Sequence, residues 1–195
     1  MKLAIIKYNA GNIQSVLNAL DRMGVKASVT DDPSEIKSAD KVIFPGVGEA
    51  SSAMKSLQAN NLHTVIKELK QPVLGICVGM QLLCNHSEEN DTECLGIVPV
   101  QIKKFPSSLK LKVPQVGWNN IFDLRSGLFT GVKENSYIYN VHSYYAEESP
   151  FTIATCNYGF DYAAAVKKDN FYGVQFHTEK SAETGDQIIK NFLDL

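Results

Sequence analysis

The chain has 195 residues, 44% of them hydrophobic, and a formal net charge of −2. This length and apolar content predict a single domain over residues 1–195 with a sizeable core, and the near-neutral charge gives no reason to expect nucleic acid or an anionic membrane as a partner. No apolar run approaches the length of a membrane span, and the chain begins in a strand pattern without a signal peptide. The four cysteines have neither C-x-x-C nor zinc-finger spacing. We therefore expect a reduced, cytoplasmic protein without a metal or cofactor.

The first half of the chain alternates predicted strands and helices. Strands are expected over residues 1–6, 25–30 and 41–44 and again from Val73, where short apolar runs occur. A turn from Asn9 to Asn12 leads into the first helix, whose apolar face is spaced helically and whose end is marked by Gly24. Further helices are expected to start near residues 31–34 and to cover residues 50–58 and 63–69. This rhythm predicts a parallel sheet covered by helices on both faces.

The second half has a different pattern, in which short strand-like runs are separated by turns. These runs cover residues 97–103, 137–141, 152–156, 163–167 and 171–177. Their spacing predicts antiparallel or mixed strands that extend the same sheet. A last helix is expected over residues 182–192. The predicted fold is α/β, a single domain with a mixed, mostly parallel central sheet flanked by helices and a nucleophile elbow.

The motif Gly75-Ile76-Cys77-Val78-Gly79 lies between a predicted buried strand and a predicted helix. A reactive residue between two glycines at such a turn is typical of a nucleophile elbow, here with Cys in place of Ser. The elbow is sharp, so the neighbouring side chains must be small. The N–H of Val78 would then face a developing oxyanion, and the helix N-terminus would favour the thiolate. The alternative is a buried cysteine in a tight turn.

A second motif near the C-terminus supports the catalytic interpretation. Residues 173–179 predict a strand that ends in His177, with Glu179 two positions further on. Cys77, His177 and Glu179 would supply a nucleophile, a general base and a group that orients the base. Parallel strands commonly bring residues at their C-terminal ends together, so these three side chains are expected to meet.

Two further stretches fit a substrate site. The turn Pro45-Gly46-Val47-Gly48 follows a buried strand and could offer a backbone N–H as a second oxyanion donor, although an ordinary glycine-rich turn has the same composition. His142-Ser143-Tyr144-Tyr145 follows another strand and suits a substrate wall, or a surface turn with a half-buried tyrosine. The only tryptophan, Trp118, is either a core residue or part of a partner interface. Phosphate-loop and dinucleotide fingerprints are absent from the sequence.

Taken together, these stretches resemble the class I, triad-type glutamine amidotransferases. The resemblance runs from Tyr8 to Ser181, and residues 75–81 with the His-x-Glu pair carry the family pattern. Residues 45–48, 116–119 and 141–144 are similar to the stand-alone glutaminase subunits that act in histidine biosynthesis.

The resemblance implies a role for each matching residue. Cys77 would attack the side-chain amide of L-glutamine, with His177 as the acid and base and Glu179 orienting the imidazole. The backbone N–H groups of Val78 and, after a rearrangement of the loop, Val47 would form the oxyanion hole. The residues implied around bound glutamine are Gly48, Gln81, Glu89, His142, Ser143 and Tyr144.

The resemblance also implies a heterodimer with a cyclase subunit of (β/α)₈-barrel fold, which would receive the ammonia. Five positions depart from the family pattern without removing a triad member: Lys7, Asn9, Gln115, Asn140 and Thr178. Gln115 and Asn140 lie in motifs that family members place near the barrel. Thr178 replaces the usual proline between the histidine and the glutamate, which could loosen their geometry.

Three alternatives remain open on the sequence. The chain could be the glutaminase subunit of another pathway, such as anthranilate, aminodeoxychorismate or pyridoxal phosphate synthesis, although the loop at residues 45–48 and the His142 motif argue against these. It could be a catalytically silent interaction subunit, against which the intact triad argues. It could also be a cysteine peptidase or a general hydrolase, which a preference for glutamine as substrate would exclude.

Overall fold

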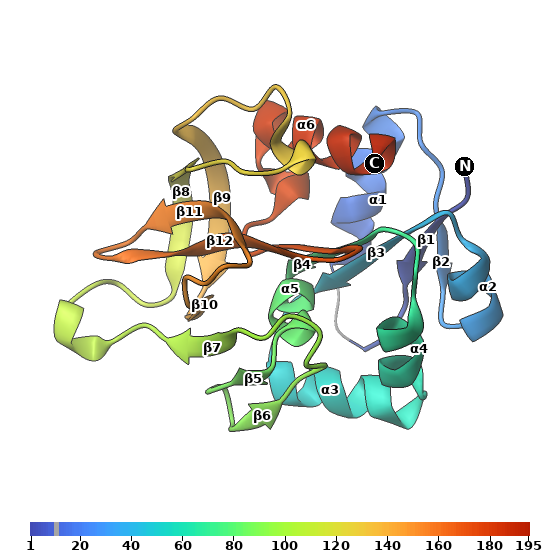
Figure 1. Cartoon of the computed structure of the whole chain (residues 1–195), viewed down its shortest axis with the longest axis horizontal. Helices are drawn as coiled ribbons and strands as arrows, with labels where there is room; N and C mark the ends of the chain where they lie inside the picture. The colour runs from blue at the N-terminus through green and yellow to red at the C-terminus, as the bar shows by residue number, and fades with distance from the viewer. Residues whose placement is uncertain (10–11) are drawn as a thin grey trace.

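The computed structural model describes residues 1–9 and 12–195, which form one thirteen-stranded sheet with helices on both faces (Figure 1). Ala10 and Gly11, in the middle of the predicted first turn, lie outside the described residues. The path through the sheet is β2-β1-β3-β4-β13-β12-β10-β7-β5-β6, with β11, β8 and β9 branching from β12. The parallel part of the sheet brings the ends of β3, β4 and β13 together at one edge.

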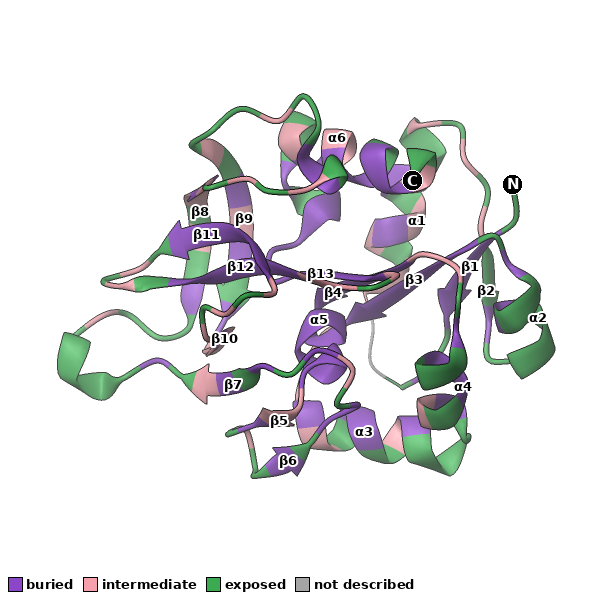
Figure 2. Ribbon diagram, viewed as in Figure 1, coloured by how far each residue is buried: buried purple, intermediate pink, exposed green. Residues whose placement is uncertain are grey.

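The first half of the chain builds the parallel part. Its strands are β1 (Leu3–Ile6), β2 (Ser28–Thr30), β3 (Lys41–Gly46) and β4 (Val73–Cys77), and its helices are α1 (Ile13–Arg22), α2 (Pro33–Ser38), α3 (Ala50–Ala59), α4 (Leu62–Glu68) and α5 (Val78–Leu83). All residues of β1, β3 and β4 are buried (Figure 2). Continuous apolar strands of this kind are expected where helices cover both faces of a sheet, so the predicted architecture is confirmed.

The second half adds strands that are mostly antiparallel. They are β5 (His86–Ser87), β6 (Thr92–Glu93), β7 (Gln101–Lys104), β8 (Gln115–Phe122), β9 (Ser136–His142), β10 (Tyr144–Ala146), β11 (Thr152–Asn157), β12 (Asp161–Lys168) and β13 (Phe171–Val174). Helix α6 (Ala182–Asp194) closes the chain, and short 3-10 helices cover Ser107–Leu109, Gly127–Phe129 and Thr178–Lys180. Two pairings are exceptions: β13 pairs parallel to β4, although antiparallel to β12, and β5 pairs parallel to β7.

Three predicted strand boundaries differ from the structure by three or more residues. The strand expected from residue 97 begins at Gln101, because the N–H groups of Ile97 and Val98 bind the Leu83 carbonyl at the end of α5. The strand expected from Val25 begins at Ser28, because the Val25 N–H binds Leu20 and closes α1. The strand expected over 171–177 ends at residue 174. Strands β5, β6, β8 and β10 were not predicted as strands.

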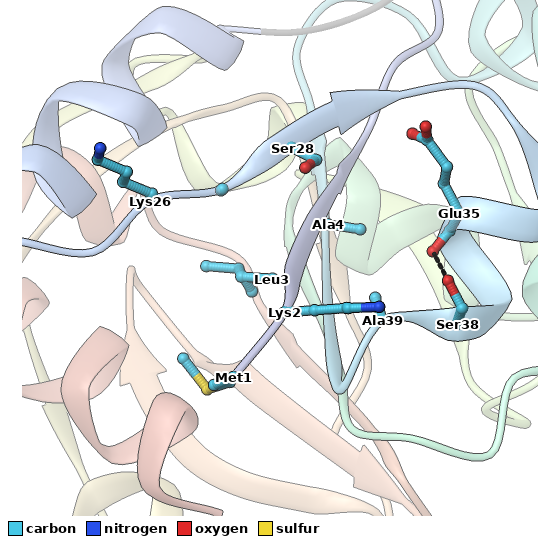
Figure 3. Close-up of a pocket in the computed structure, with 10 residues that line it drawn as sticks. Met1, Lys2, Leu3, Ala4, Lys26, Ser28, Glu35, Ser38 and Ala39 are labelled. Atoms are coloured by element: carbon cyan, nitrogen blue, oxygen red, sulfur yellow. Dashed lines mark hydrogen bonds between the residues drawn. The ribbon is translucent and has the colours of Figure 1, made fainter.

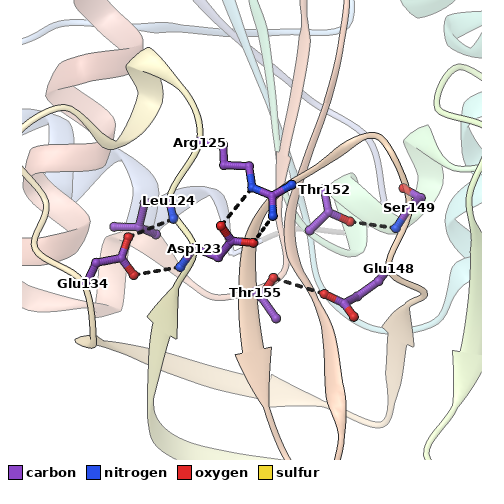
Figure 4. Close-up of polar contacts among 8 residues, drawn as sticks. All are labelled: Asp123, Leu124, Arg125, Glu134, Glu148, Ser149, Thr152 and Thr155. Carbon is purple, nitrogen blue, oxygen red and sulfur yellow. Dashed lines mark hydrogen bonds and ion pairs between the residues drawn. The ribbon is translucent and has the colours of Figure 1, made fainter.

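The loop ends of the β8–β9–β11 branch are held by side-chain hydrogen bonds (Figure 4). The Glu134 carboxylate accepts hydrogen bonds from the backbone N–H groups of Asp123, at 2.7 Å, and Leu124, at 3.0 Å. Asp123 has a positive φ of 57°, which an aspartate tolerates better than most residues. Asp123 also pairs with Arg125. These contacts fix the end of the branch that lies away from β4.

Candidate active site

Cys77 lies at a strained turn between β4 and α5, as predicted. Its φ is +55° and its ψ −112°, a conformation that L-residues avoid and that persists only where the surroundings enforce it. The surroundings do so because α5 lies directly on the sheet. A Cβ on Gly79 would stand 1.9 Å from the Phe44 carbonyl oxygen of β3, and one on Gly75 would stand 2.9 Å from the Gly79 backbone. The two glycines of the motif are therefore required by close packing.

His177 and Glu179 reach the same place from β13. This strand pairs with β4 in register, with Val174 opposite Ile76, so the segment after β13 passes the end of β4. The His177 backbone N–H donates to the Tyr139 carbonyl at 2.9 Å, which fixes the turn. The His177 Nδ1 lies 2.7 Å from the Glu179 Oε1, and both side chains are buried.

The pKa of His177 is raised although the side chain is buried. Burial alone lowers this pKa, but hydrogen bonds to Cys77 and Glu179, together with their charges, raise it to about 10. The His177 Nδ1–H therefore donates to the Glu179 carboxylate, and the other ring nitrogen, Nε2, is left to interact with the Cys77 sulfur. An imidazolium beside a cysteine favours the thiolate, which is the nucleophilic form. The pattern is that of a cysteine nucleophile with an oriented base.

A cavity of about 290 Å³ opens in front of Cys77. Ten of the eleven residues predicted for the site line it, and Glu179 lies behind His177 in a smaller crevice. Pro114 and Val141 complete the lining, which contains no lysine or arginine. The predicted lining residues are Val47, Gly48, Cys77, Val78, Gln81, Glu89, His142, Ser143, Tyr144 and His177.

Glu89 and His142 present different chemistry to this cavity. Glu89 is half-buried, and burial raises the pKa of its carboxyl group, although the Ala50 N–H donates to its Oε2 at 2.7 Å. His142 is buried, and burial lowers its pKa to about 4, so the imidazole is neutral near pH 7. Its Nδ1 lies 2.7 Å from the Tyr144 carbonyl, which can only accept, so the proton is on Nδ1. Besides the His177 imidazolium, the cavity thus offers one carboxylate and several neutral polar groups.

Val78 and Val47, the two predicted oxyanion donors, both line the cavity in front of Cys77. Val78 is the first residue of α5, where an N–H has no acceptor within the helix. Val47 belongs to the loop after β3, and the next residue, Gly48, has a φ of +93° that only glycine adopts readily. Tyr8 donates its hydroxyl to the Pro45 carbonyl at 2.8 Å and thereby anchors the start of this loop.

Sequence reasoning missed two polar residues at the site, Tyr8 and Gln175. Tyr8 is part of the buried core and supports the Pro45 loop. Gln175 is fully buried, and its Nε2 lies 3.9 Å from the Cys77 sulfur. The sequence did contain a signal for Gln175, because its amide lies between the apolar Val174 and Phe176. A polar side chain in a buried apolar run needs a hydrogen-bond partner, so a buried polar contact could have been predicted there.

Other features of the described residues offer less chemistry. A cavity of about 420 Å³ lies where β1, β2 and α2 meet, and its lining contains no cysteine or histidine (Figure 3). Among the described residues, no group of three or more His, Cys, Asp or Glu side chains is arranged to hold a metal ion. None of the described helices is both long and apolar enough to cross a membrane.

The chain is similar in sequence and in fold to several known proteins. The family model described as glutamine amidotransferase class-I matches residues 4–195. The chain is 55% identical to the imidazole glycerol phosphate synthase subunit HisH of Bacteroides fragilis and 44% identical to that of Escherichia coli K12, in both cases over the full length of both proteins. Its fold is similar to that of PurLQS from Thermotoga maritima, with a TM-score of 0.72 at 17% identity, covering 99% of this chain and 97% of the other.

Proposed function

Because the chain belongs to the class-I glutamine amidotransferase family, we propose that it is the glutaminase subunit of an imidazole glycerol phosphate synthase, which acts in histidine biosynthesis. It hydrolyses L-glutamine to glutamate and ammonia and delivers the ammonia to a second subunit. The observation that carries this proposal is the buried Cys77, His177 and Glu179 constellation at the end of a cavity of suitable size. A catalytically silent subunit would have no need for the strained Cys77 turn.

The first step in this proposal is attack of the Cys77 thiolate on the side-chain amide carbon of glutamine. The carbonyl oxygen becomes an oxyanion, which the N–H groups of Val78 and Val47 would hold, the latter after the Val47 peptide has turned. Collapse of this intermediate breaks the C–N bond. The leaving nitrogen takes a proton from the His177 imidazolium and departs as ammonia, so that a γ-glutamyl thioester remains on Cys77.

The second step returns the enzyme to its starting state. Neutral His177 accepts a proton from a water molecule, which attacks the thioester carbon and releases glutamate. The carboxylate of Glu179, 2.7 Å from His177 Nδ1, keeps the imidazole oriented through both steps. The high pKa of His177 fits its role as the proton donor in the first step.

The lining of the cavity supports glutamine as the substrate. The Glu89 carboxylate would bind the α-ammonium group. Because no lysine or arginine lines the cavity, the α-carboxylate would rest on backbone N–H groups of the loop that carries Ser143 and Tyr144. Gly48, Gln81 and His142 would complete the walls of this substrate site.

An exposed apolar surface beside the cavity supports a partner subunit. The ribbon face, as we call it, consists of Val116 and Trp118 on β8 with Tyr137, Tyr139 and Val141 on β9, which cross-strand pairing places side by side. Trp118 is 55% exposed and Tyr137 63%, and large exposed aromatic groups are characteristic of interfaces. Val141 also lines the cavity. A partner on the ribbon face would therefore receive ammonia without its passing through bulk water.

We propose that this partner is a cyclase subunit with a (β/α)₈-barrel fold and that the two subunits form a heterodimer in the cytoplasm, where a catalytic thiol stays reduced. The cyclase would use the ammonia to make imidazole glycerol phosphate and an aminoimidazole carboxamide ribotide. At neutral pH free ammonia is mostly protonated and not nucleophilic, so direct transfer has a chemical advantage.

The test measures glutamate release from glutamine by the chain alone, with the cyclase subunit, and with the cyclase subunit carrying its ribonucleotide ligand. Low activity alone, a large increase in the loaded complex and none in the Cys77→Ala variant would support the proposal. Full activity without a partner would instead favour another amidotransferase. Activity that survives in Cys77→Ala would show that Cys77 is not the nucleophile.

A further inference from the structure

A glutamine that none of the proposed steps uses contacts the nucleophile. Gln175 directly follows β13 and is fully buried. Its backbone N–H donates to the Ala164 carbonyl of β12 at 2.8 Å, so the residue is anchored to the middle of the sheet. From there its side chain extends between α5 and the end of β4. Its Nε2 lies 3.9 Å from the Cys77 Sγ and its Oε1 lies 3.0 Å from the Gln81 Nε2.

The direction of every hydrogen bond in this cluster follows from one backbone oxygen. The Tyr144 carbonyl can only accept, and it lies 2.7 Å from His142 Nδ1 and 3.3 Å from the Gln81 amide nitrogen. That same nitrogen of Gln81 therefore donates to Gln175. The Gln175 atom that faces it must be the oxygen, and so the NH₂ group of Gln175 faces the sulfur.

His177 is the charged group beside the sulfur, and among the neutral groups there this orientation distinguishes Gln175 from the Val141 carbonyl. The Val141 carbonyl oxygen lies 4.0 Å from Cys77 Sγ, where it can accept a hydrogen bond from a thiol but would repel a thiolate. The Gln175 amide is a donor, and a donor stabilises a thiolate. The two groups thus favour opposite protonation states of Cys77.

We infer that Gln175 is a positioning residue that holds the Cys77 sulfur as a thiolate and that Gln81 links it to the substrate loop at Tyr144. The inference rests on the proposed function, because it concerns the same nucleophile. It also gives Gln81 a second task besides lining the cavity. Substrate glutamine bound against Ser143 and Tyr144 would lie next to the Tyr144 carbonyl, from which this chain of hydrogen bonds starts.

The test is the pH profile of Cys77 alkylation by iodoacetamide, followed by peptide mass spectrometry on the full chain. All four cysteines are buried, but Cys77 alone among them lines the cavity, and the modified peptide identifies which one has reacted. Methionine matches the length of glutamine but donates no hydrogen bond. In Gln175→Met we expect the midpoint of the alkylation profile to rise by about 0.5 to 1 pH unit. In the complex, kcat should fall about tenfold while the KM for glutamine stays nearly constant.

Two further variants make the result decisive. Gln71→Met is the matched control, because Gln71 also donates through its amide to a carbonyl, that of Ile36 at 2.8 Å, but lies before β4 at the opposite end of the strand from Cys77. Its alkylation midpoint should equal that of the wild type. Gln81→Met keeps Gln175 but removes the donor that orients it, so its midpoint should also rise. Gln81→Met decides the matter if Gln175→Met does not fold.

The inference would be overturned if the folded Gln175→Met chain, or Gln81→Met in its place, kept the wild-type alkylation midpoint. That outcome would leave the proposed function intact, provided that Cys77→Ala still abolishes glutaminase activity in the complex. Conversely, a wild-type complex that does not hydrolyse glutamine would refute the proposed function, while the alkylation profiles would still report on the contact between Gln175 and the sulfur.

Discussion

Replacing Gly79 with alanine should destabilise the protein and displace Cys77, the proposed nucleophile. The added Cβ would stand 1.9 Å from the Phe44 carbonyl oxygen, whereas Cβ contacts under 3.0 Å essentially never occur. Helix α5 and strand β3 would have to separate by roughly 1 Å, and Phe44 is fully buried in the sheet. Overpacking of this kind costs about 3 kcal/mol, and the better helix propensity of alanine returns about 1 kcal/mol. We expect a net loss of about 2 kcal/mol or more.

Urea unfolding of the isolated chain measures this loss. Gly127→Ala is the matched control, because its Cβ would meet Leu195 at an ordinary 3.5 Å and its φ is not positive. The free energy of unfolding of Gly127→Ala should stay within about 0.5 kcal/mol of the wild type. A loss of less than about 1 kcal/mol in Gly79→Ala would refute the argument that close packing requires this glycine.

The same variant also has a functional readout. Cys77 is two residues before Gly79, so a shift of α5 moves the sulfur away from His177. A misplacement of about 1 Å can cost about 10²-fold in rate. Glutamate release by the complex should therefore fall by about that factor in the fraction of Gly79→Ala that remains folded. An unchanged kcat would mean that the turn holds Cys77 independently of α5.

Four other variants, of which Asn191→Leu is a control, test individual contacts. Because folding raises the pKa of His177 from 6.5 to about 10, the imidazolium stabilises the folded state fully below pH 6.5, and this stabilisation is lost as the pH rises through about 10. The melting temperature of the wild type should therefore fall over that pH range. The fall should be smaller in Glu179→Gln. Among the described residues, the buried Asn140 amide has no partner, so Asn140→Leu should raise the free energy of unfolding by about 1 kcal/mol, whereas Asn191→Leu, which loses bonds to two carbonyls, should lower it. Thr178→Pro should keep full glutaminase activity and gain about 0.5 kcal/mol in urea unfolding, and a clear loss of activity would contradict the geometry described for this turn.

Thr178 does not loosen the geometry of His177 and Glu179, although its place in the usual position of a proline suggested that it could. Thr178 starts a 3-10 helix directly after His177, whose φ of −83° and ψ of 99° keep it outside the helical region that a following proline disfavours. His177 and Glu179 remain 2.7 Å apart with threonine between them. Threonine therefore does not separate the pair, although its own hydroxyl is buried without a partner among the described residues.

The sequence patterns predicted best those parts of the site that depend on neighbours in the chain. The glycines around Cys77 and the His177-x-Glu179 spacing each encode one turn, and both turns form as expected. Alternation of apolar runs and helical faces likewise predicted the parallel half of the sheet. In these cases a short stretch contains the whole physical reason for its structure.

Features that depend on distant contacts were not predictable in the same way. Strand β8 carries polar and exposed residues such as Trp118 and Asn119, so it lacks an apolar run and is defined by pairing with β9 and β11. Strands β5 and β6 have two residues each, too few for any periodicity. The role of Gln175 depends on Gln81, which is 94 residues away in the sequence.

The position of β13 determines when an active chain can exist during its synthesis. This strand is nearly the last element made, yet it lies between β4 and β12 in the middle of the sheet. Until it emerges from the ribosome, one edge of β4 is unpaired, and an unpaired strand edge can associate with other chains. The thiol at Cys77 is thus made about a hundred residues before His177, its proposed base, and a truncated or stalled chain carries the proposed nucleophile without that base.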